Sequence, residues 1–568
     1  MGLAFVLASA GLGCTGVVAK EGSNKPGGTN PAGTGGAGSG GMSGGDMKPP
    51  NQAADCEGWD IAMPKRLIRL SFNQLATSLG PIFGADFQAK VVADNSIKDP
   101  TERTFPPLGD TDEGSSYIDS KWQTADGIAQ AAGAQALSTF ATFTGCGATP
   151  TTDCAQAFVA KLAERAFRRP LDDREKMSLL TVYSEVVAKG GTVQEATQYS
   201  VNAIFEAPEF LYRTEFGSDL TKEGPLTPYE LASQLSYFVT DGPPDDGLLM
   251  AAAQNMLATP EQIGPHVDRM LATPAARLNL QAAVVASIGL SKVLSVVIDP
   301  AKVPEFNAGV AASMFHETEL LIQNVLWNGG KVPELVTSRK GFINAKLAPF
   351  YGVAAPTVLD ADGFGPVDLP DTRAGLLTSL GFLTSRSRPD SQSVVGRGLS
   401  INDTILCQQN PAFPDNLADQ IKAVTMTQGD LSERQRADYR ASNSPCVGCH
   451  PSFDPFGISL ENFDTVGRYR TMDDQGRPID ASVTLPASAG GSMAGSAAQM
   501  GEALANTGAF SSCAATKLLT YALAETGVKG NSCATKAVAE AFKTTDQSFS
   551  ALVRTVAMSK TITQRSGG

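Results

Sequence analysis

The sequence predicts a mostly α-helical protein, a multidomain helical scaffold with a loop-rich module towards its C-terminus. Its 568 residues are too many for one hydrophobic core. Apolar residues recur at helical spacing from Cys56 onward, and no run alternates between apolar and polar residues as a half-buried strand would. Turn-forming residues replace this pattern from near residue 385, and helical spacing returns around Cys513 and Cys533.

We expect seven segments in chain order. They are a lipoprotein-type export signal (1–20), a Gly-rich disordered tether (21–55), helical modules (56–145, 146–220 and 221–370), a module with a C-x-x-C-H motif (371–490) and a final helical module (491–568). This order separates an N-terminal leader from the part of the chain that is expected to fold.

The leader begins MGLAFVLASAGLGCTG, a short apolar run followed by small residues and Cys14. The run is shorter than the roughly 20 apolar residues that span a bilayer, so we interpret it as an export signal with Cys14 as the lipidated residue. No Lys or Arg precedes the run, and Gly-Leu-Gly stands where Leu-small-small is usual. Residues 21–50 hold eleven glycines and no aromatic residue, so we expect a disordered tether between a membrane and the folded modules.

The helices can be predicted one by one. The first ends at Gly80–Pro81 and has four leucines near one face: Leu67, Leu70, Leu75 and Leu79. Residues 153–191 predict two helices, the first ending at Pro170 and the second capped by Asp172 or Asp173; the helix over 192–217 is broken at Pro208. Thr227 and Glu230 predict a capping box. The apolar residues 280–298 include Gln281 and Lys292, which predicts a buried helix rather than a membrane span, and residues 316–330 and 373–386 continue the helical pattern.

Nine cysteines are present, and eight remain if Cys14 carries lipid. The even number fits disulfides in an oxidising compartment. Cys146 and Cys154 enclose a turn-rich loop and are expected to pair. We also expect a Cys513–Cys533 bridge between two helices, worth about 3 kcal/mol in the chain-entropy model. Two cysteines far apart in sequence, Cys56 and Cys407, either pair or stay as buried thiols.

Cys446, Cys449 and His450 form a C-x-x-C-H motif in a chain with three histidines. In c-type cytochromes the two thiols add to the haem vinyl groups and the adjacent histidine binds iron. Attachment takes place outside the cytoplasm, in agreement with export. We therefore expect one covalent haem c, held by these three residues.

Other interpretations of the motif remain open. A structural zinc site needs two further ligands, and His266 and His316 lie far upstream in helical sequence. A thioredoxin-like redox pair needs a βαβ setting, which the sequence lacks. A plain Cys446–Cys449 disulfide is the third alternative.

Further haem contacts are expected on less specific grounds. Met493 and His316 are candidates for the sixth iron ligand, beside water or an open position; a methionine favours electron transfer, whereas an open position permits small-ligand or peroxide chemistry. Arg468 and Arg470 are candidates to pair with haem propionates, because Arg binds carboxylates through two hydrogen bonds. The alternative is ion pairing with the nearby carboxylates Asp473 and Asp474. The last expected feature is a turn formed by Asp454, Pro455 and Gly457.

The segment CVGCHPSFDPFGISLENFDTVGRYR resembles the signature of a large exported bacterial family, the planctomycete-type cytochrome c multidomain proteins. The family's modules are catalogued as domains of unknown function 1587, 1595, 1592, 1588 and 1585 in chain order. KRLIRLSFNQLATSLG resembles the first, AERAFRRPL and IFEAPEFLYRTE the second, LASQLSYFVTDGPPDDGLL and RMLATPAAR the third, RAGLLTSLGFLTSRSRPDSQSVVGRG the fourth and CAATKLLTYALAE the fifth.

The resemblance covers about residues 60–565 and implies a haem at Cys446, Cys449 and His450, a mostly helical fold and an extracytoplasmic lipoprotein. It implies no established reaction. Relatives often have a histidine shortly before C-x-x-C-H, where this chain has ADYRASNSP, and Phe72-Asn73 replaces their usual Tyr-Asn pair.

Two functions follow as hypotheses. The first is a lipid-anchored monohaem c-type cytochrome-like protein of the cell envelope, at the outer membrane or facing the periplasm, that exchanges electrons with an unknown redox partner or substrate. The second is a non-haem structural or binding lipoprotein, related to polysaccharide, with a Cys446–Cys449 disulfide. A redox role is favoured over a hydrolase, because the only other histidines are His266 and His316. The net charge of −13 excludes nucleic acid as a partner.

Overall fold

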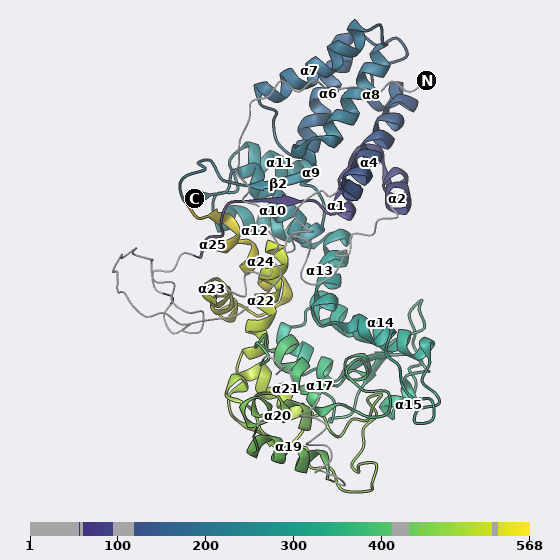
Figure 1. The fold of residues 1–568 in the computed structure, drawn as a ribbon, viewed down its shortest axis with the longest axis vertical. Helices are drawn as coiled ribbons and strands as arrows, with labels where there is room; N and C mark the ends of the chain where they lie inside the picture. The colour runs from purple at the N-terminus through teal and green to yellow at the C-terminus, as the bar shows by residue number, and fades with distance from the viewer. Residues whose placement is uncertain are drawn as a thin grey trace, which may run out of the picture. The chain divides into compact units, whose positions relative to one another are not determined.

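The computed structural model describes residues 56, 61–94, 119–411, 431–444, 446–524 and 532–567, which form a mostly helical protein as predicted (Figure 1). The predicted signal, Cys14 and the whole predicted tether lie outside these residues. Strands in the described ranges are short and antiparallel: Arg66–Arg69 (β1) with Tyr212–Glu215 (β2), Gly224–Pro225 (β3) with Gln564–Arg565 (β8), Lys340–Ile343 (β4) with Gly365–Asp368 (β5), and Val483–Thr484 (β6) with Met493–Ala494 (β7). No helix within these ranges is long and apolar enough to cross a membrane.

The N-terminal helices surround one apolar core that includes Leu75, Ala129 and Phe205. α8 packs against α4, α6 and α7, and Figure 1 shows these helices close together. The helices of this part are α1 (Phe72–Phe83), α2 (Ala85–Asp94), α4 (Asp119–Ser138), α5 (Phe140–Thr144), α6 (Thr152–Phe167), α7 (Asp173–Ala188), α8 (Val193–Glu206) and α9 (Pro208–Leu211).

The first predicted helix is correct only in its second half. Residues 66–69 form β1, which pairs with β2, and Leu67 is 48% exposed. The helix α1 begins after Ser71, whose hydroxyl accepts the amide of Gln74 in a capping box, and it continues through Pro81 instead of ending there. The Leu spacing could not distinguish the two states, because a four-residue strand leaves too few positions to set a period.

Three other predicted helix boundaries are confirmed. The chain breaks at Pro170, and Asp172 caps α7. The next helix ends before Pro208. Thr227 and Glu230 form the predicted capping box at the start of α10 (Pro228–Thr240).

The predicted helices over 192–217, 316–330 and 373–386 differ in extent: the first gives way to the strand Tyr212–Glu215, the second begins at Ala308, and the third is only two short turns, Gly375–Thr378 and Leu380–Thr384.

A second apolar core continues from the central helices through the C-x-x-C-H module to the C-terminal helices. The central helices are α10, α11 (Asp246–Ala253), α12 (Pro260–Leu271), α13 (Pro274–Ser287) and α14 (Ala308–Trp327). The C-terminal ones are α21 (Ala497–Asn506), α22 (Ala509–Leu523), α23 (Ser532–Lys543), α24 (Phe549–Ala557) and α25 (Lys560–Thr563). The predicted buried helix over 280–298 divides at Gly289, which has φ 62°, into α13 and the 3₁₀ turn η2 (Leu290–Leu294).

Short elements connect these two sets of helices. Their bounds are η3 (Val332–Val336), α15 (Ala348–Tyr351), η4 (Gly375–Thr378), α16 (Leu380–Thr384), α17 (Val394–Ser400), η5 (a π-helical turn, Ile401–Ile405), α19 (Glu433–Ser442), η6 (Cys446–Gly448), η7 (His450–Ser452), α20 (Asp454–Ile458) and η8 (Ala487–Ala489). The region predicted to be loop-rich from residue 385 therefore contains mostly short helices and turns, β-bridges and one short strand pair, together with the ten-residue helix α19.

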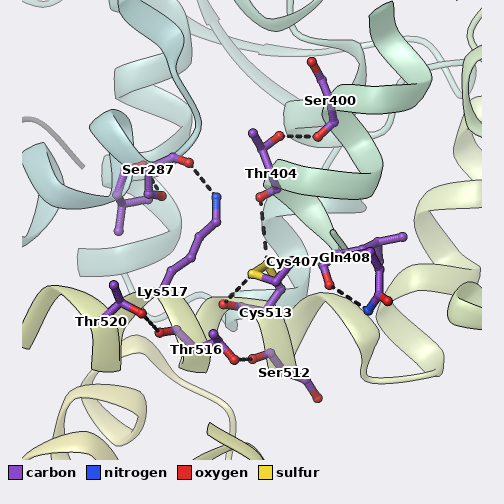
Figure 2. Close-up of a disulfide and its surroundings, with 12 residues drawn as sticks. Ser287, Ser400, Thr404, Cys407, Gln408, Ser512, Cys513, Thr516, Lys517 and Thr520 are labelled. Carbon is purple, nitrogen blue, oxygen red and sulfur yellow. Dashed lines mark hydrogen bonds between the residues drawn. A yellow bond between two sulfur atoms is a disulfide. The ribbon is translucent and has the colours of Figure 1, made fainter. Parts of the chain in front are cut away.

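Three disulfides join six of the eight described cysteines, which indicates an extracytoplasmic protein. The predicted Cys146–Cys154 bridge is confirmed. The predicted Cys513–Cys533 bridge is wrong, because Cys513 bonds to Cys407 and Cys533 bonds to Cys56. Figure 2 shows the bond between Cys407, two residues after η5, and Cys513 in α22.

The helix pair α22–α23 explains the wrong pairing. Gly508, before α22, lies next to Lys543 at the end of α23, so the two helices are antiparallel. Cys513 and Cys533 each lie near the start of their own helix. They are therefore at opposite ends of the pair and out of reach of each other.

A buried ionic cluster holds β1, β2 and β8 together. Glu215 in β2 accepts a hydrogen bond from Arg66 Nε at 2.7 Å and one from Arg565, and Arg213 lies 3.9 Å away. Burial alone raises the pKa of the Glu215 carboxyl, but the three guanidinium groups outweigh it and lower that pKa to about 2. The carboxylate therefore stabilises the fold in its charged form.

We predict that Glu215→Ala destabilises the protein by about 3 kcal/mol at pH 7, since the pKa shift from 4.5 to about 2 is worth about 1.4 kcal/mol per unit. The contribution is complete above the unfolded pKa and is lost as the pH falls through the folded pKa. The difference between wild type and variant in urea denaturation should therefore shrink below pH 4.5. Glu223→Ala, which removes a partly exposed carboxylate, is the control and should change stability little. A pH-independent difference would contradict the assignment.

We predict that peptide mapping without reduction recovers Cys407–Cys513 and Cys56–Cys533 linked peptides, and no Cys513–Cys533 peptide. Replacing Cys407 and Cys513 by Ala should cost about 5 kcal/mol, because the bond closes a loop of 106 residues. Replacing Cys146 and Cys154, eight residues apart, should cost about 2 to 3 kcal/mol in the same denaturation assay. Equal losses would contradict the chain-entropy explanation.

Candidate functional site

The C-x-x-C-H motif lies in two consecutive 3₁₀ turns, η6 and η7, after α19. The amides of Cys446 and Val447 donate to the carbonyl of Asn443 at 2.9 and 3.0 Å, and the amide of Cys449 donates to the carbonyl of Cys446 at 3.1 Å. These turns hold two thiols and one imidazole on five residues. Both thiols are partly exposed and unbonded, whereas every other described cysteine is in a disulfide.

His450 is held by a carboxylate that is itself held by an arginine. Its Nδ1 lies 3.1 Å from Asp454 Oδ1, and Asp454 Oδ2 accepts a hydrogen bond from Arg440 Nε of α19 at 2.6 Å. The Asp454 side chain is 5% exposed, that of Arg440 11% and that of His450 20%. The imidazole also packs on the ring of Phe453, with 4.9 Å between ring centroids.

Sequence reasoning assigned Asp454 only to a turn and did not single out Arg440. In the structure Asp454 begins α20, four residues after His450, so that the two side chains meet. The sequence signal that could have identified this contact was the four-residue spacing between His450 and Asp454, together with Arg440 on the helix before the motif.

Two glycines set the position of α20 against α17. A Cβ on Gly398 would overlap the carbonyl of Phe453, and a Cβ on Gly457 would overlap the carbonyl of Val394. The backbones therefore approach more closely than any side chain would allow. This approach fixes Asp454, and through it His450, against the scaffold.

Buried arginines hold the loop that follows α20. Arg397, fully buried, donates to the carbonyls of Phe463 and Asp464 at 2.6 Å each. Arg373 donates to the carbonyl of Gly467 at 3.0 Å, and its guanidinium lies 4.8 Å from the centre of the Phe463 ring. Burial lowers the pKa of Arg397 to about 9, which still leaves it charged at neutral pH.

The two arginines expected at haem propionates are paired with carboxylates of the protein. Arg468 bonds to Asp464 at 2.7 Å and to Glu305 at 2.5 Å. Arg470 bonds to Asp474 at 2.6 Å, the ion pair that was the alternative. A role for either residue at a propionate stays a prediction.

The two candidates for the sixth ligand lie on other elements. Met493 in β7 is 70% exposed, and its sulfur accepts the hydroxyl of Thr484 at 3.0 Å. His316 in α14 lies 3.4 Å from Glu319 through Nδ1 and packs edge-on against Phe364. Among the described residues, no hydrogen bond or ring contact joins either side chain to His450, and the sixth ligand stays a prediction.

The residues around the motif fit a covalently attached haem. Two free thiols stand at the attachment spacing, and no described residue forms a hydrogen bond with His450 Nε2 while Nδ1 contacts Asp454. Arg440 Nη2 is buried and has no partner in the described part of the chain, and such a donor suits a propionate. The described ranges contain no group of three or more His, Cys, Asp or Glu side chains that would hold a metal ion by itself.

We predict that Gly457→Ala destabilises the C-x-x-C-H module by 1 to 3 kcal/mol or more, because the added methyl group overlaps backbone rather than a movable side chain. Gly448→Ala is the matched control inside the motif, since a Cβ there meets no atom within 4 Å. Thermal denaturation and limited proteolysis between α17 and α20 measure the difference. Equal behaviour of the two variants would contradict the close packing.

Four protein families of unknown function match the chain in sequence order: DUF1595 at residues 154–215, DUF1592 at 226–353, DUF1588 at 373–473 and DUF1585 at 490–562. The DUF1588 match, named PSCyt3, covers the C-x-x-C-H motif, and its name suggests a cytochrome-like domain. DUF1587, expected at the first helices, is not found. No curated protein and no solved structure is significantly similar to the chain. The chain belongs to the planctomycete-type multidomain family in which these modules follow one another in this order.

Proposed function

We propose that this protein is an exported, lipid-anchored monohaem c-type cytochrome-like protein that transfers electrons to or from a partner or substrate. Cys446 and Cys449 form the thioether bonds and His450 binds the iron. The observation that carries the proposal is which cysteines form disulfides and which two stay unbonded. The other six described cysteines are used in disulfides, and the two unbonded ones stand beside a histidine at the c-type spacing.

A bound haem supplies one-electron chemistry at its iron. The residues around the motif fix the orientation of its histidine. Asp454 is buried and Arg440 is mostly buried, so they hold the imidazole in one orientation instead of leaving it mobile in solvent. Val447, between the two thiols, is 48% exposed, so this edge of the motif is open to an approaching partner.

The proposed location agrees with the cysteine chemistry. Disulfides and thioether-linked haem both form outside the cytoplasm. Lipidation at Cys14 supplies the membrane attachment in this proposal, and the partner is a second redox protein or an envelope substrate, including polysaccharide.

We predict that the full chain, expressed with a c-type maturation system, is red and keeps its haem after denaturing electrophoresis. Cys446→Ser/Cys449→Ser should abolish the haem stain and the mass increment of one haem. Cys146→Ser/Cys154→Ser removes two cysteines elsewhere and should retain both. A folded, colourless wild-type protein with a Cys446–Cys449 disulfide would overturn the proposal and favour a non-haem envelope lipoprotein.

A further inference from the structure

Asp454 is in a position to control the chemistry of His450 beyond holding it in place. A carboxylate is an acceptor only, so the proton of the neutral imidazole lies on Nδ1 and the lone pair on Nε2. Among the described residues, Nε2 makes no hydrogen bond. Nε2 is therefore the nitrogen that is ready to bind a metal.

The group that accepts the Nδ1–H hydrogen bond determines how strongly Nε2 donates electrons to a bound metal. A hydrogen bond from Nδ1–H to an anion transfers more negative charge to the ring than one to a neutral carbonyl, which raises the basicity of the ligand. Asp454 is almost fully buried, so water does not screen this effect. Arg440 shares the same carboxylate through its other oxygen and draws part of the charge away.

We propose that Asp454 is a positioning residue that makes His450 a strongly donating iron ligand, and that Arg440 limits this effect. The inference rests on the proposed haem at Cys446 and Cys449. A stronger donor stabilises ferric over ferrous iron, so the pair sets a lower reduction potential than a neutral acceptor would. Asp454 thus favours a protein that gives electrons away once reduced.

The decisive variant is Asp454→Asn in the full-length haem-loaded protein. The amide oxygen can still accept Nδ1–H while the charge is removed, but the amide nitrogen then faces the Nε–H donor of Arg440. Asp438→Asn is the matched control, because it removes one exposed carboxylate from α19, the helix that carries Arg440. Asp454→Asn/Arg440→Gln avoids leaving Arg440 buried without a counter-charge.

Spectroelectrochemical titration should give a higher midpoint potential for Asp454→Asn and for the double variant than for wild type and Asp438→Asn. The iron–histidine stretching band, recorded after photolysis of the carbon monoxide adduct, should move to lower frequency in the Asp454 variants alone. A potential and a band equal to those of Asp438→Asn would overturn the inference.

If the Asp454→Asn protein does not accumulate with haem, the Arg440→Gln variant tests the inference instead. Its potential should be lower than that of wild type and of Arg436→Gln, a control on the same helix, because the full carboxylate charge then acts on His450. An unchanged potential would overturn the inference. A wild-type protein without haem would instead refute the proposed function, so the two failures are distinguishable.

Discussion

Buried arginines that donate to backbone carbonyls hold the irregular parts of this protein together. A loop that leaves helix and sheet must still satisfy its carbonyls, and a guanidinium offers five donors from one side chain. Arg397 and Arg373 do this for the loop after α20, and Arg168 does it at the end of α9, donating to the carbonyls of Glu209 and Tyr212 at 2.7 Å each. The C-x-x-C-H turns lie next to the first of these loops, so their position depends on these bonds.

Close backbone packing links the C-x-x-C-H site to the helical scaffold. α20 packs against α17 at backbone distance, and its Phe456 belongs to the core that continues into the central and C-terminal helices. The motif is therefore part of a larger packed body and not an appended domain. A partner that approaches Val447 meets a motif whose histidine is held by Asp454 and, through Asp454, by Arg440.

Local signals in the sequence predicted most helix boundaries and the residues of the motif. Asp172 and Thr227 were found because a cap acts on residues three positions away. Contacts between distant segments could not be predicted from such local signals. The Cys513 bridge was assigned wrongly because spacing does not determine connectivity, and β1 was missed because its stability comes from β2, about 150 residues later. The buried arginines were missed because an isolated Arg is usually exposed.

The bond between Cys56 and Cys533 also has a mechanical meaning. Cys56 lies 477 residues before its partner, where the expected tether ends. Tension applied between the chain before Cys56 and the chain after Cys533 passes through one covalent bond into α23. The covalent path that carries such a load therefore does not run through the chain between the two cysteines, which includes the C-x-x-C-H turns.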